Sequence, residues 1–286
     1  MPSIHKLAVI FVLFWFAGIV WCFLYLASGP TPKRLGLDAP PTESTAFNVC
    51  STNEPKFENL VIIIPFRDLK EDLLSQGAGR EQNLRDWLYY MNAFLKLGPV
   101  HICVIEQSKK GAFNKGFLFN VGYNICGKNS KYMVFHDVDQ VPEIAENDYS
   151  FMEDPVHMIG ATSQWDYKPT GYGTCGGALM ITPQKYKKIN GYSNKFAGWG
   201  LEDENMCIRL GKHFGKTKKL SAKIGRYRAL SHSRVKGLDE NSQFRENAKN
   251  KNDVTSGLTD LSYKVLHGAE YEEGNLSVHR CIVEET

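Results

Sequence analysis

An unbroken apolar run from Leu60 to Ile64, which ends in Pro65-Phe66-Arg67, constrains the fold of this chain more than any other stretch. Such a run is typical of a strand that is buried on both faces, as strands in a parallel sheet are. A helical stripe follows, made by Leu84, Trp87, Leu88, Met91, Phe94 and Leu95. Strand-like segments at 100–105 and 132–135 flank a helix-like segment at 117–123. This alternation predicts an α/β fold with a largely parallel sheet.

Polar residues follow two of these strands. In open α/β sheets, ligands bind at the carboxyl ends of the strands, which is where Phe66-Arg67 and Asp137-Val138-Asp139 lie. If the extended conformation continues past the strand, Asp137 and Asp139 point the same way. Two converging carboxylates favour a hard divalent cation such as Mg²⁺ or Mn²⁺.

A second acidic stretch is Gly198-Trp199-Gly200-Leu201-Glu202-Asp203-Glu204-Asn205. The glycines permit backbone angles that other residues resist, and the indole of Trp199 offers a flat apolar face for a sugar ring. The segment from Met206 onward is predicted to be helical, so the carboxylates would also be favoured by the helix dipole. A solvated helix start is therefore the alternative interpretation of the acidic residues alone.

The N-terminal part of the chain has a different composition. Residues 7–27 form an uncharged apolar run of 21 residues, which is long enough to cross a bilayer. A cleaved signal peptide is the alternative, although its apolar core is usually only about 7–15 residues long. The proline-rich stretch 28–56 is predicted to be an extended stem. We therefore expect a cytoplasmic tail at 1–6, an anchor at 7–27, a stem at 28–56 and a lumenal domain at 57–286.

Charge, cysteine content and a glycosylation sequon bear on the protein's partners and cellular compartment. A net charge of +3 over 286 residues gives no support for a nucleic-acid partner. Six cysteines lie outside the apolar run, an even number that permits disulfides in an oxidising lumen, with the pairing left open. Asn275-Leu276-Ser277 is a glycosylation sequon.

Taken together in their order, the motifs resemble those of β-1,4-galactosyltransferases, over about residues 57 to 250. The motifs are Ile63-Ile64-Pro65-Phe66-Arg67, Phe113-Asn114-Lys115, Asn120-Val121-Gly122, Phe135-His136-Asp137-Val138-Asp139, Gly176-Gly177, Ile189-Asn190-Gly191-Tyr192, Gly198-Trp199-Gly200 with Glu202-Asp203, and Gly225-Arg226 through His232-Ser233-Arg234. The tail from Gly257 to Cys281 is more similar to the xylose-galactosylating branch. The region of His232 is more similar to the lactosamine-forming branch.

The resemblance implies a GT-A-like fold, a Rossmann-type mixed sheet flanked by helices, in a type II Golgi membrane protein. It also implies Mn²⁺-dependent, inverting transfer of galactose from UDP-galactose to GlcNAc or xylose on a glycoprotein, proteoglycan or glycolipid. The donor-binding residues that it implies are Pro65, Phe66, Arg67, Phe113, Lys115, Asp137, Val138 and Thr174. It implies further that Asp139 and His232 bind the metal, that Trp199, Gly200 and Glu202 contact the acceptor, and that Asp203 is the catalytic base, with Glu202 beside it.

Three departures from the family pattern leave alternatives open. Ala229 stands where lactosamine-forming members have a metal-binding Met. Glu204 is followed by Asn205 at the third acidic position. Thr174 stands where many members have a Tyr beside the donor's 2-position. The alternatives are a transferase that uses UDP-GalNAc or UDP-GlcNAc, and a catalytically weak, membrane-anchored sugar-binding homologue.

Overall fold

The computed structural model describes residues 60–68, 79–96, 99–171, 173–231 and 240–286, all within a compact unit that spans Phe47–Thr286. The expected tail, membrane anchor and stem, together with His232, lie outside the described residues. No helix within the described ranges has the length and apolar character needed to cross a membrane.

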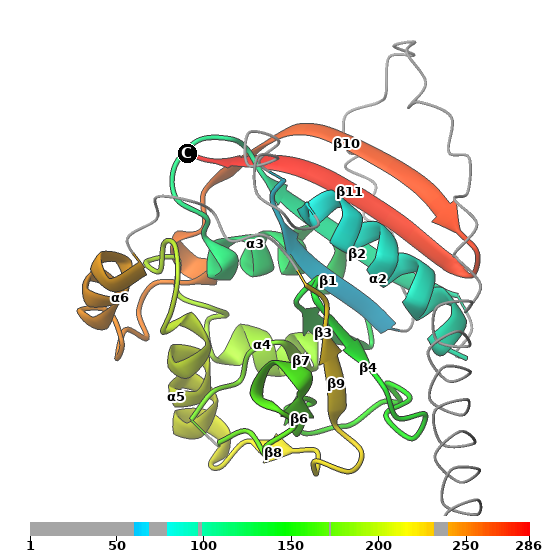
Figure 1. Cartoon of the computed structure of the whole chain (residues 1–286). Helices are drawn as coiled ribbons and strands as arrows, with labels where there is room; N and C mark the ends of the chain where they lie inside the picture. The colour runs from blue at the N-terminus through cyan, green and yellow to red at the C-terminus, as the bar shows by residue number, and fades with distance from the viewer. Residues whose placement is uncertain (1–59, 69–78, 97–98, 172, 232–239) are drawn as a thin grey trace, which may run out of the picture. The chain divides into compact units, whose positions relative to one another are not determined.

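A mixed eight-stranded sheet forms the centre of the domain (Figure 1). In spatial order its strands are β10 (Tyr263–Glu273), β11 (Leu276–Glu285), β2 (Val100–Gln107), β1 (Leu60–Phe66), β3 (Tyr132–His136), β7 (Ala178–Ile181), β5 (Val156–His157) and β8 (Lys218–Lys219). The four central strands β11, β2, β1 and β3 are parallel to one another, and β7 and β10 run antiparallel to their neighbours. The α/β fold with a mixed sheet is thus confirmed.

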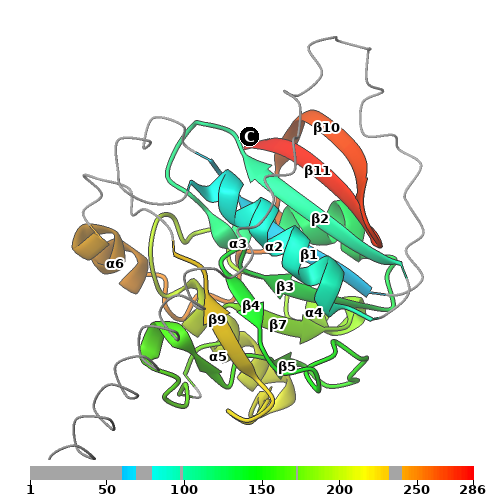
Figure 2. The same cartoon turned by 45° about the vertical axis from the view of Figure 1, so that its right-hand side comes forward.

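Both faces of the central strands are buried, as the apolar run of β1 predicts. On one face Ile62 and Ile64 pack in a core with Trp87 and Met91 of α2 (Arg80–Phe94). On the other face Ile63 packs in a second core with residues of α3 (Lys115–Gly122). The two helices therefore cover opposite faces of the sheet, and the long β10–β11 hairpin extends it at one edge (Figure 2).

Among the described residues, the remaining elements are a small second sheet and six further helical segments. A small three-stranded sheet is made by β4 (Gln140–Pro142), β9 (Arg226–Ala229) and β6 (Ala161–Thr162). The helical segments are η2 (Tyr123–Gly127), η3 (Ser163–Trp165), α4 (Pro183–Lys188), α5 (Glu202–Phe214), α6 (Glu240–Ala248) and η4 (Leu258–Asp260). The predicted helix behind the acidic stretch is α5, and it begins at Glu202 rather than at Met206.

Two disulfides are present among the described residues, Cys103–Cys126 and Cys175–Cys207. The first ties β2 to η2, and the second ties the segment before β7 to α5. Cys281 is buried in β11, and Cys50 lies outside the described residues. The expectation of disulfides is confirmed, and the structure supplies the pairing that the sequence left open.

Candidate active site

The acidic stretch becomes the first turn of α5, and a buried lysine faces it from α3. Lys115 Nζ lies 3.0 Å from Asp203 Oδ2, 3.1 Å from Asp137 Oδ1 and 3.6 Å from Glu202 Oε1. The three carboxylates come from two places far apart in the chain, the end of β3 and the start of α5. Lys115 therefore joins the two sides of the site.

Burial determines the electrostatics of this cluster. Burial and the nearby charge of Asp203 raise the pKa of Glu202 to about 7. The pKa of Asp203 is also raised, first by burial, although the Lys115 ammonium opposes the shift. Burial alone would lower the pKa of Lys115, but the charges of Asp137, Asp203 and Glu202 outweigh it and raise that pKa well above its usual value. A carboxylate whose pKa is nearer neutrality is a better general base at physiological pH.

Two backbone segments pack around Asp203: the loop that leads into α5, and the segment that contains Gly176. Leu201 adopts a left-handed conformation (φ 75°), as do Gly198 (φ 74°) and Gly200 (φ 100°). Gly176 faces the carboxylate so closely that a β-carbon at position 176 would lie 1.9 Å from Asp203 Oδ2. Only a residue without a side chain fits there, so Gly176 leaves the space that the Asp203 carboxylate occupies.

Asp137 and Asp139 lie in a turn and not in an extended strand, because β3 ends at His136 and β4 begins at Gln140. Gly177 O accepts the Asp137 N–H at 2.8 Å, and the chain turns there. The carboxylates consequently meet different cations: Asp137 meets Lys115, and Asp139 Oδ2 lies 2.8 Å from Arg80 Nη1. The extended conformation on which the parallel orientation of the two side chains depended is therefore not present. His136, the last residue of β3, is buried, and burial lowers its pKa to about 4.

The end of β9 lies next to Asp139. Leu230 N–H donates to Asp139 O at 2.7 Å, and Asn83 Nδ2 donates to Ser231 O at 3.1 Å. The chain thus reaches the neighbourhood of Asp139 one residue before His232. Ala229 pairs with Gln140 in the small sheet. Among the described residues no three His, Cys, Asp or Glu side chains gather as a metal site. The assignment of Asp139 and His232 to the metal stays a prediction.

The expected donor-binding residues lie at the ends of β1 and β3 and in the loops beside them. Pro65, Phe66 and Val138 are buried. Arg67 is half-buried, donates from Nη1 to Gly111 O at 2.9 Å, and lies 5.5 Å from the centre of the Phe113 ring. Thr174 is half-buried, two residues before Gly176. The structure thus places Arg67 with Phe113, and Lys115 with Asp137, on the strand-end side of the site.

Trp199 is 57% exposed and lies on a loop held by α6. Its ring centre is 5.9 Å from that of Phe244, which is 40% exposed. Asn247 donates from Nδ2 to the carbonyls of Ala197, Trp199 and Gly200, and Gln243 Oε1 accepts the Trp199 N–H. Two exposed aromatic rings side by side form an apolar platform next to Glu202 and Asp203. Phe244 and its helix were not predicted from the sequence.

Two of the sequence observations find simple structural accounts. Asn205, which follows the third acidic position Glu204, is buried and donates to Lys251 O and Asp253 O, so it fixes α5 to the chain that follows α6. Asn275 is exposed in the turn between β10 and β11, where a glycan has room.

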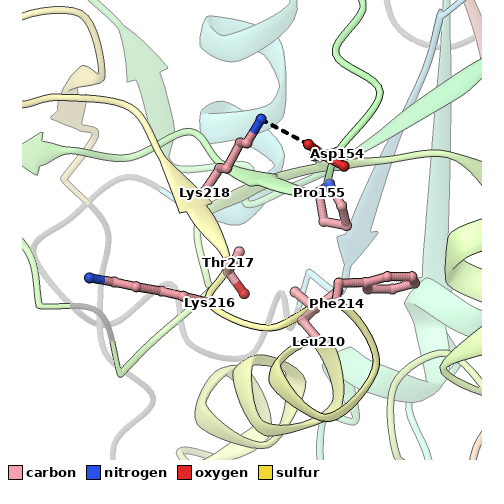
Figure 3. A pocket seen from close by; sticks show the side chains of 7 residues that line it. All are labelled: Asp154, Pro155, Leu210, Phe214, Lys216, Thr217 and Lys218. Carbon is pink, nitrogen blue, oxygen red and sulfur yellow. Dashed lines mark ion pairs between the residues drawn. The ribbon is translucent and has the colours of Figure 1, made fainter.

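A hollow between Asp154 and the end of α5 shares no residue with the carboxylate cluster, and its Lys218 is paired with Asp154 (Figure 3).

Comparison with known proteins identifies the family. The model described as "N-terminal region of glycosyl transferase group 7" matches residues 50–152, and the one described as "N-terminal domain of galactosyltransferase" matches residues 156–233. Bovine beta-1,4-galactosyltransferase 1 is 33% identical over 74% of this chain and 52% of its own length. Human beta-1,4-galactosyltransferase 4 is 30% identical over 73% of this chain and 59% of its own length. The chain therefore spans little more than half of these curated relatives.

Solved structures share the fold. The catalytic domain of Drosophila beta1,4galactosyltransferase 7 in complex with xylobiose superimposes with a TM-score of 0.63 and 23% identity, over 80% of this chain and 94% of that one. A mutant of that enzyme in complex with manganese, UDP-Gal and xylobiose gives a TM-score of 0.64 at 24% identity. The mixed sheet is thus that of a GT-A-like glycosyltransferase. With the two matching models, the chain belongs to glycosyltransferase group 7.

Proposed function

We propose that this protein transfers galactose from UDP-galactose to a terminal GlcNAc or xylose in β-1,4 linkage, with inversion and with Mn²⁺. The observation that carries the proposal is the position of Asp203: a mostly buried carboxylate with a raised pKa, four residues after Trp199 and 3.0 Å from Lys115 Nζ. The names of the relatives, β-1,4-galactosyltransferases, support the donor and the linkage.

The chemistry assigned to each group follows from its place. Asp203 takes the proton of the acceptor hydroxyl as the new bond forms, and its raised pKa suits that task. Trp199 and Phe244 hold the acceptor ring so that this hydroxyl lies in line, which contributes by proximity. Lys115 and Arg67 lie on the donor side and supply positive charge near the leaving diphosphate. Because the acceptor attacks directly, no enzyme nucleophile is needed.

The residues near Asp139 suit Mn²⁺. The Asp139 carboxylate is half-buried, it already pairs with a cationic group, Arg80, and it lies beside the chain that leads to His232. A carboxylate oxygen and an imidazole nitrogen are both ligands that Mn²⁺ accepts. Asp139 and His232 would hold the ion, which when bound neutralises charge on the diphosphate.

We also propose that residues 7–27 anchor the protein in the Golgi membrane with the domain in the lumen. The 21-residue apolar run supports the anchor. The two disulfides support an oxidising compartment, because disulfides are rare in the cytosol.

The test is a UDP-release assay with UDP-galactose and either GlcNAc or xylose acceptors, with and without Mn²⁺. Asp203→Asn is expected to lower transfer by about 10²- to 10⁴-fold, the usual contribution of a general base, while donor binding persists. Acceptor binding by the wild type without UDP release would instead favour a sugar-binding homologue. Turnover by Asp203→Asn near that of the wild type would remove Asp203 from the base role.

A further inference from the structure

The segment Cys175–Gly177 lies between the two sides of the site and contacts both. Cys175 N–H donates to Asp203 O at 3.3 Å, and Gly176 packs directly on the Asp203 carboxylate. Gly177 O accepts the Asp137 N–H at 2.8 Å. Three successive residues therefore connect Asp203 on the acceptor side to the backbone of Asp137 on the donor side.

A disulfide fixes this segment to the helix that carries Asp203. Cys175 is bonded to Cys207, with 5.5 Å between their Cα atoms. Cys207 lies four residues after Asp203 in α5, so the two side chains emerge from the same face of the helix. Within the described residues, the other polar link between the segment's backbone and Asp203 is the hydrogen bond of 3.3 Å from Cys175 N–H to Asp203 O.

Two further groups support the segment. Lys115 links the same two residues directly, since its Nζ contacts the carboxylates of both Asp137 and Asp203. Behind the segment, His157 is 3% exposed and its Nε2 lies 2.8 Å from Gly176 O. A carbonyl oxygen can only accept a hydrogen bond, so the Nε2 of His157 carries a proton and donates it.

We propose that the Cys175–Cys207 disulfide is a positioning device for the transfer reaction: it fixes the Cys175–Gly177 segment and thereby sets the separation of Asp203 from Asp137. His157 is a positioning residue that supports the same segment from behind. This inference rests on the proposed function for its kinetic consequence, but its structural part can be tested without activity.

The second disulfide of the domain provides a matched control. Cys103–Cys126 closes a loop of similar length, with a sequence separation of 23 against 32 for Cys175–Cys207. By the chain-entropy model, loss of either bond destabilises the fold by a similar amount. Cys103 belongs to β2 and Cys126 to η2, so this disulfide lies on elements that do not carry Asp137, Glu202 or Asp203. A comparison of the two double variants therefore separates positioning from general stability.

The experiment measures kcat, donor KM and Tm for Cys175→Ala/Cys207→Ala and Cys103→Ala/Cys126→Ala. We expect a similar fall in Tm for both, but a fall in kcat of about 10- to 100-fold only in the first, since misplacing a reacting group by about 1 Å has an effect of that size. Donor KM should change less than about twofold. Equal kcat losses in the two variants, or none in the first, would overturn the proposal.

Hydrogen exchange provides the readout that does not depend on activity. In Cys175→Ala/Cys207→Ala the amides at the start of α5 should exchange faster, whereas in the control they should not. Unchanged exchange there contradicts the positioning role even if the enzyme is active. A wild type without transferase activity contradicts the proposed function instead.

A third comparison applies if the first double variant does not fold. His157→Gln keeps a side-chain N–H donor for Gly176 O, and His157→Phe removes it. We expect His157→Gln to retain most of the wild-type kcat and His157→Phe to lose about tenfold at unchanged donor KM. Equal kcat values for the two variants would show that the hydrogen bond to Gly176 does not position the site.

Discussion

Gly176 and Asp203 approach so closely that a β-carbon added to the glycine would lie 1.9 Å from Asp203 Oδ2 and 2.3 Å from its Cγ. The contact is between a backbone and a carboxylate, and the carboxylate is confined by Lys115 on its other side. A methyl group at position 176 therefore has to displace Asp203.

Gly176→Ala is accordingly expected to lower kcat by about 100-fold, the scale of the loss when a reacting group is misplaced by about 1 Å. Gly173→Ala is the matched control, because it lies in the same loop and a β-carbon there meets nothing within 4 Å. Steady-state kinetics and thermal unfolding of both variants test this. Turnover by Gly176→Ala equal to that of Gly173→Ala would contradict the packing argument.

The acid limb of the pH–rate profile should lie at higher pH than the titration of an exposed carboxyl. Burial raises the pKa of Asp203 and takes that of Glu202 to about 7, whereas an exposed carboxyl titrates near about 4. A base works in its deprotonated form, so kcat should rise as pH rises through this region. Lys115 stays protonated over the same range, because its pKa is raised well above its usual value.

Lys115→Met tests whether the charge of Lys115 influences the pKa of Asp203. The Lys115 charge lowers the pKa of Asp203, so its removal should move the acid limb of kcat to higher pH. The measurement is kcat at saturating donor from pH 5 to 9 for the wild type and the variant. A wild-type kcat that does not fall between neutrality and pH 5, or a limb that does not move in the variant, would refute this account.

The central strands and the helix α2 that packs on them were predictable from the sequence, because the positions of their apolar residues show which faces are buried. Leu60–Phe66 is apolar throughout and is buried on both faces, and the stripe of α2 packs against it. The turn at Asp137–Asp139 was not predictable, since it depends on a hydrogen bond to Gly177, forty residues away. The paired motif Asp-x-Asp carries no information about such a contact.

The platform beside Trp199 was missed for a similar reason. The α6 sequence is polar apart from Phe244 and Ala248, and its hydrogen bonds to the Trp199 loop are made by Gln243 and Asn247. Long-range hydrogen bonds of this kind leave no periodic signal. The pairing of Cys175 with Cys207 likewise requires the fold to be known.

Phe244→Ala is expected to raise the acceptor KM about tenfold with little change in donor KM. The ring is 40% exposed and lies beside Trp199, so it offers apolar surface to a sugar without supporting a core. A tenfold change corresponds to about 1.4 kcal/mol, which is within the range of an aromatic contact. Tyr89→Ala, an exposed aromatic on α2, is the control. Equal effects of the two substitutions on acceptor KM would exclude Phe244 from the acceptor platform.

Asp139→Ala and His232→Ala are both expected to weaken Mn²⁺ binding. Each removes one ligand of a type that Mn²⁺ accepts. The measurement is electron paramagnetic resonance of free Mn²⁺ during titration of each variant with UDP present. Glu146→Ala removes an exposed carboxylate from a nearby loop and should bind Mn²⁺ as the wild type does. Unchanged Mn²⁺ affinity in both variants would contradict the assignment of Asp139 and His232 as metal ligands.

Thr174 offers a test of donor choice. It is half-buried and lies two residues before Gly176, and thus near Asp203 and the donor side of the site. A tyrosine there would crowd the 2-position of the donor sugar, whereas threonine leaves room for an acetamido group. Differences in pocket shape of this kind discriminate by about 1–3 kcal/mol. The wild type should therefore use UDP-galactose and also transfer appreciable N-acetylhexosamine.

The comparison needs three donors at equal concentration, UDP-galactose, UDP-GalNAc and UDP-GlcNAc, with the wild type and with Thr174→Tyr. The larger side chain is expected to raise the ratio of galactose to N-acetylhexosamine transfer about tenfold, which corresponds to about 1.4 kcal/mol. Thr174→Ser, which keeps the hydroxyl and the small volume, should leave that ratio near the wild-type value. If tyrosine leaves the ratio unchanged as well, position 174 does not contact the donor sugar, and the breadth of donor use must be set elsewhere in the pocket.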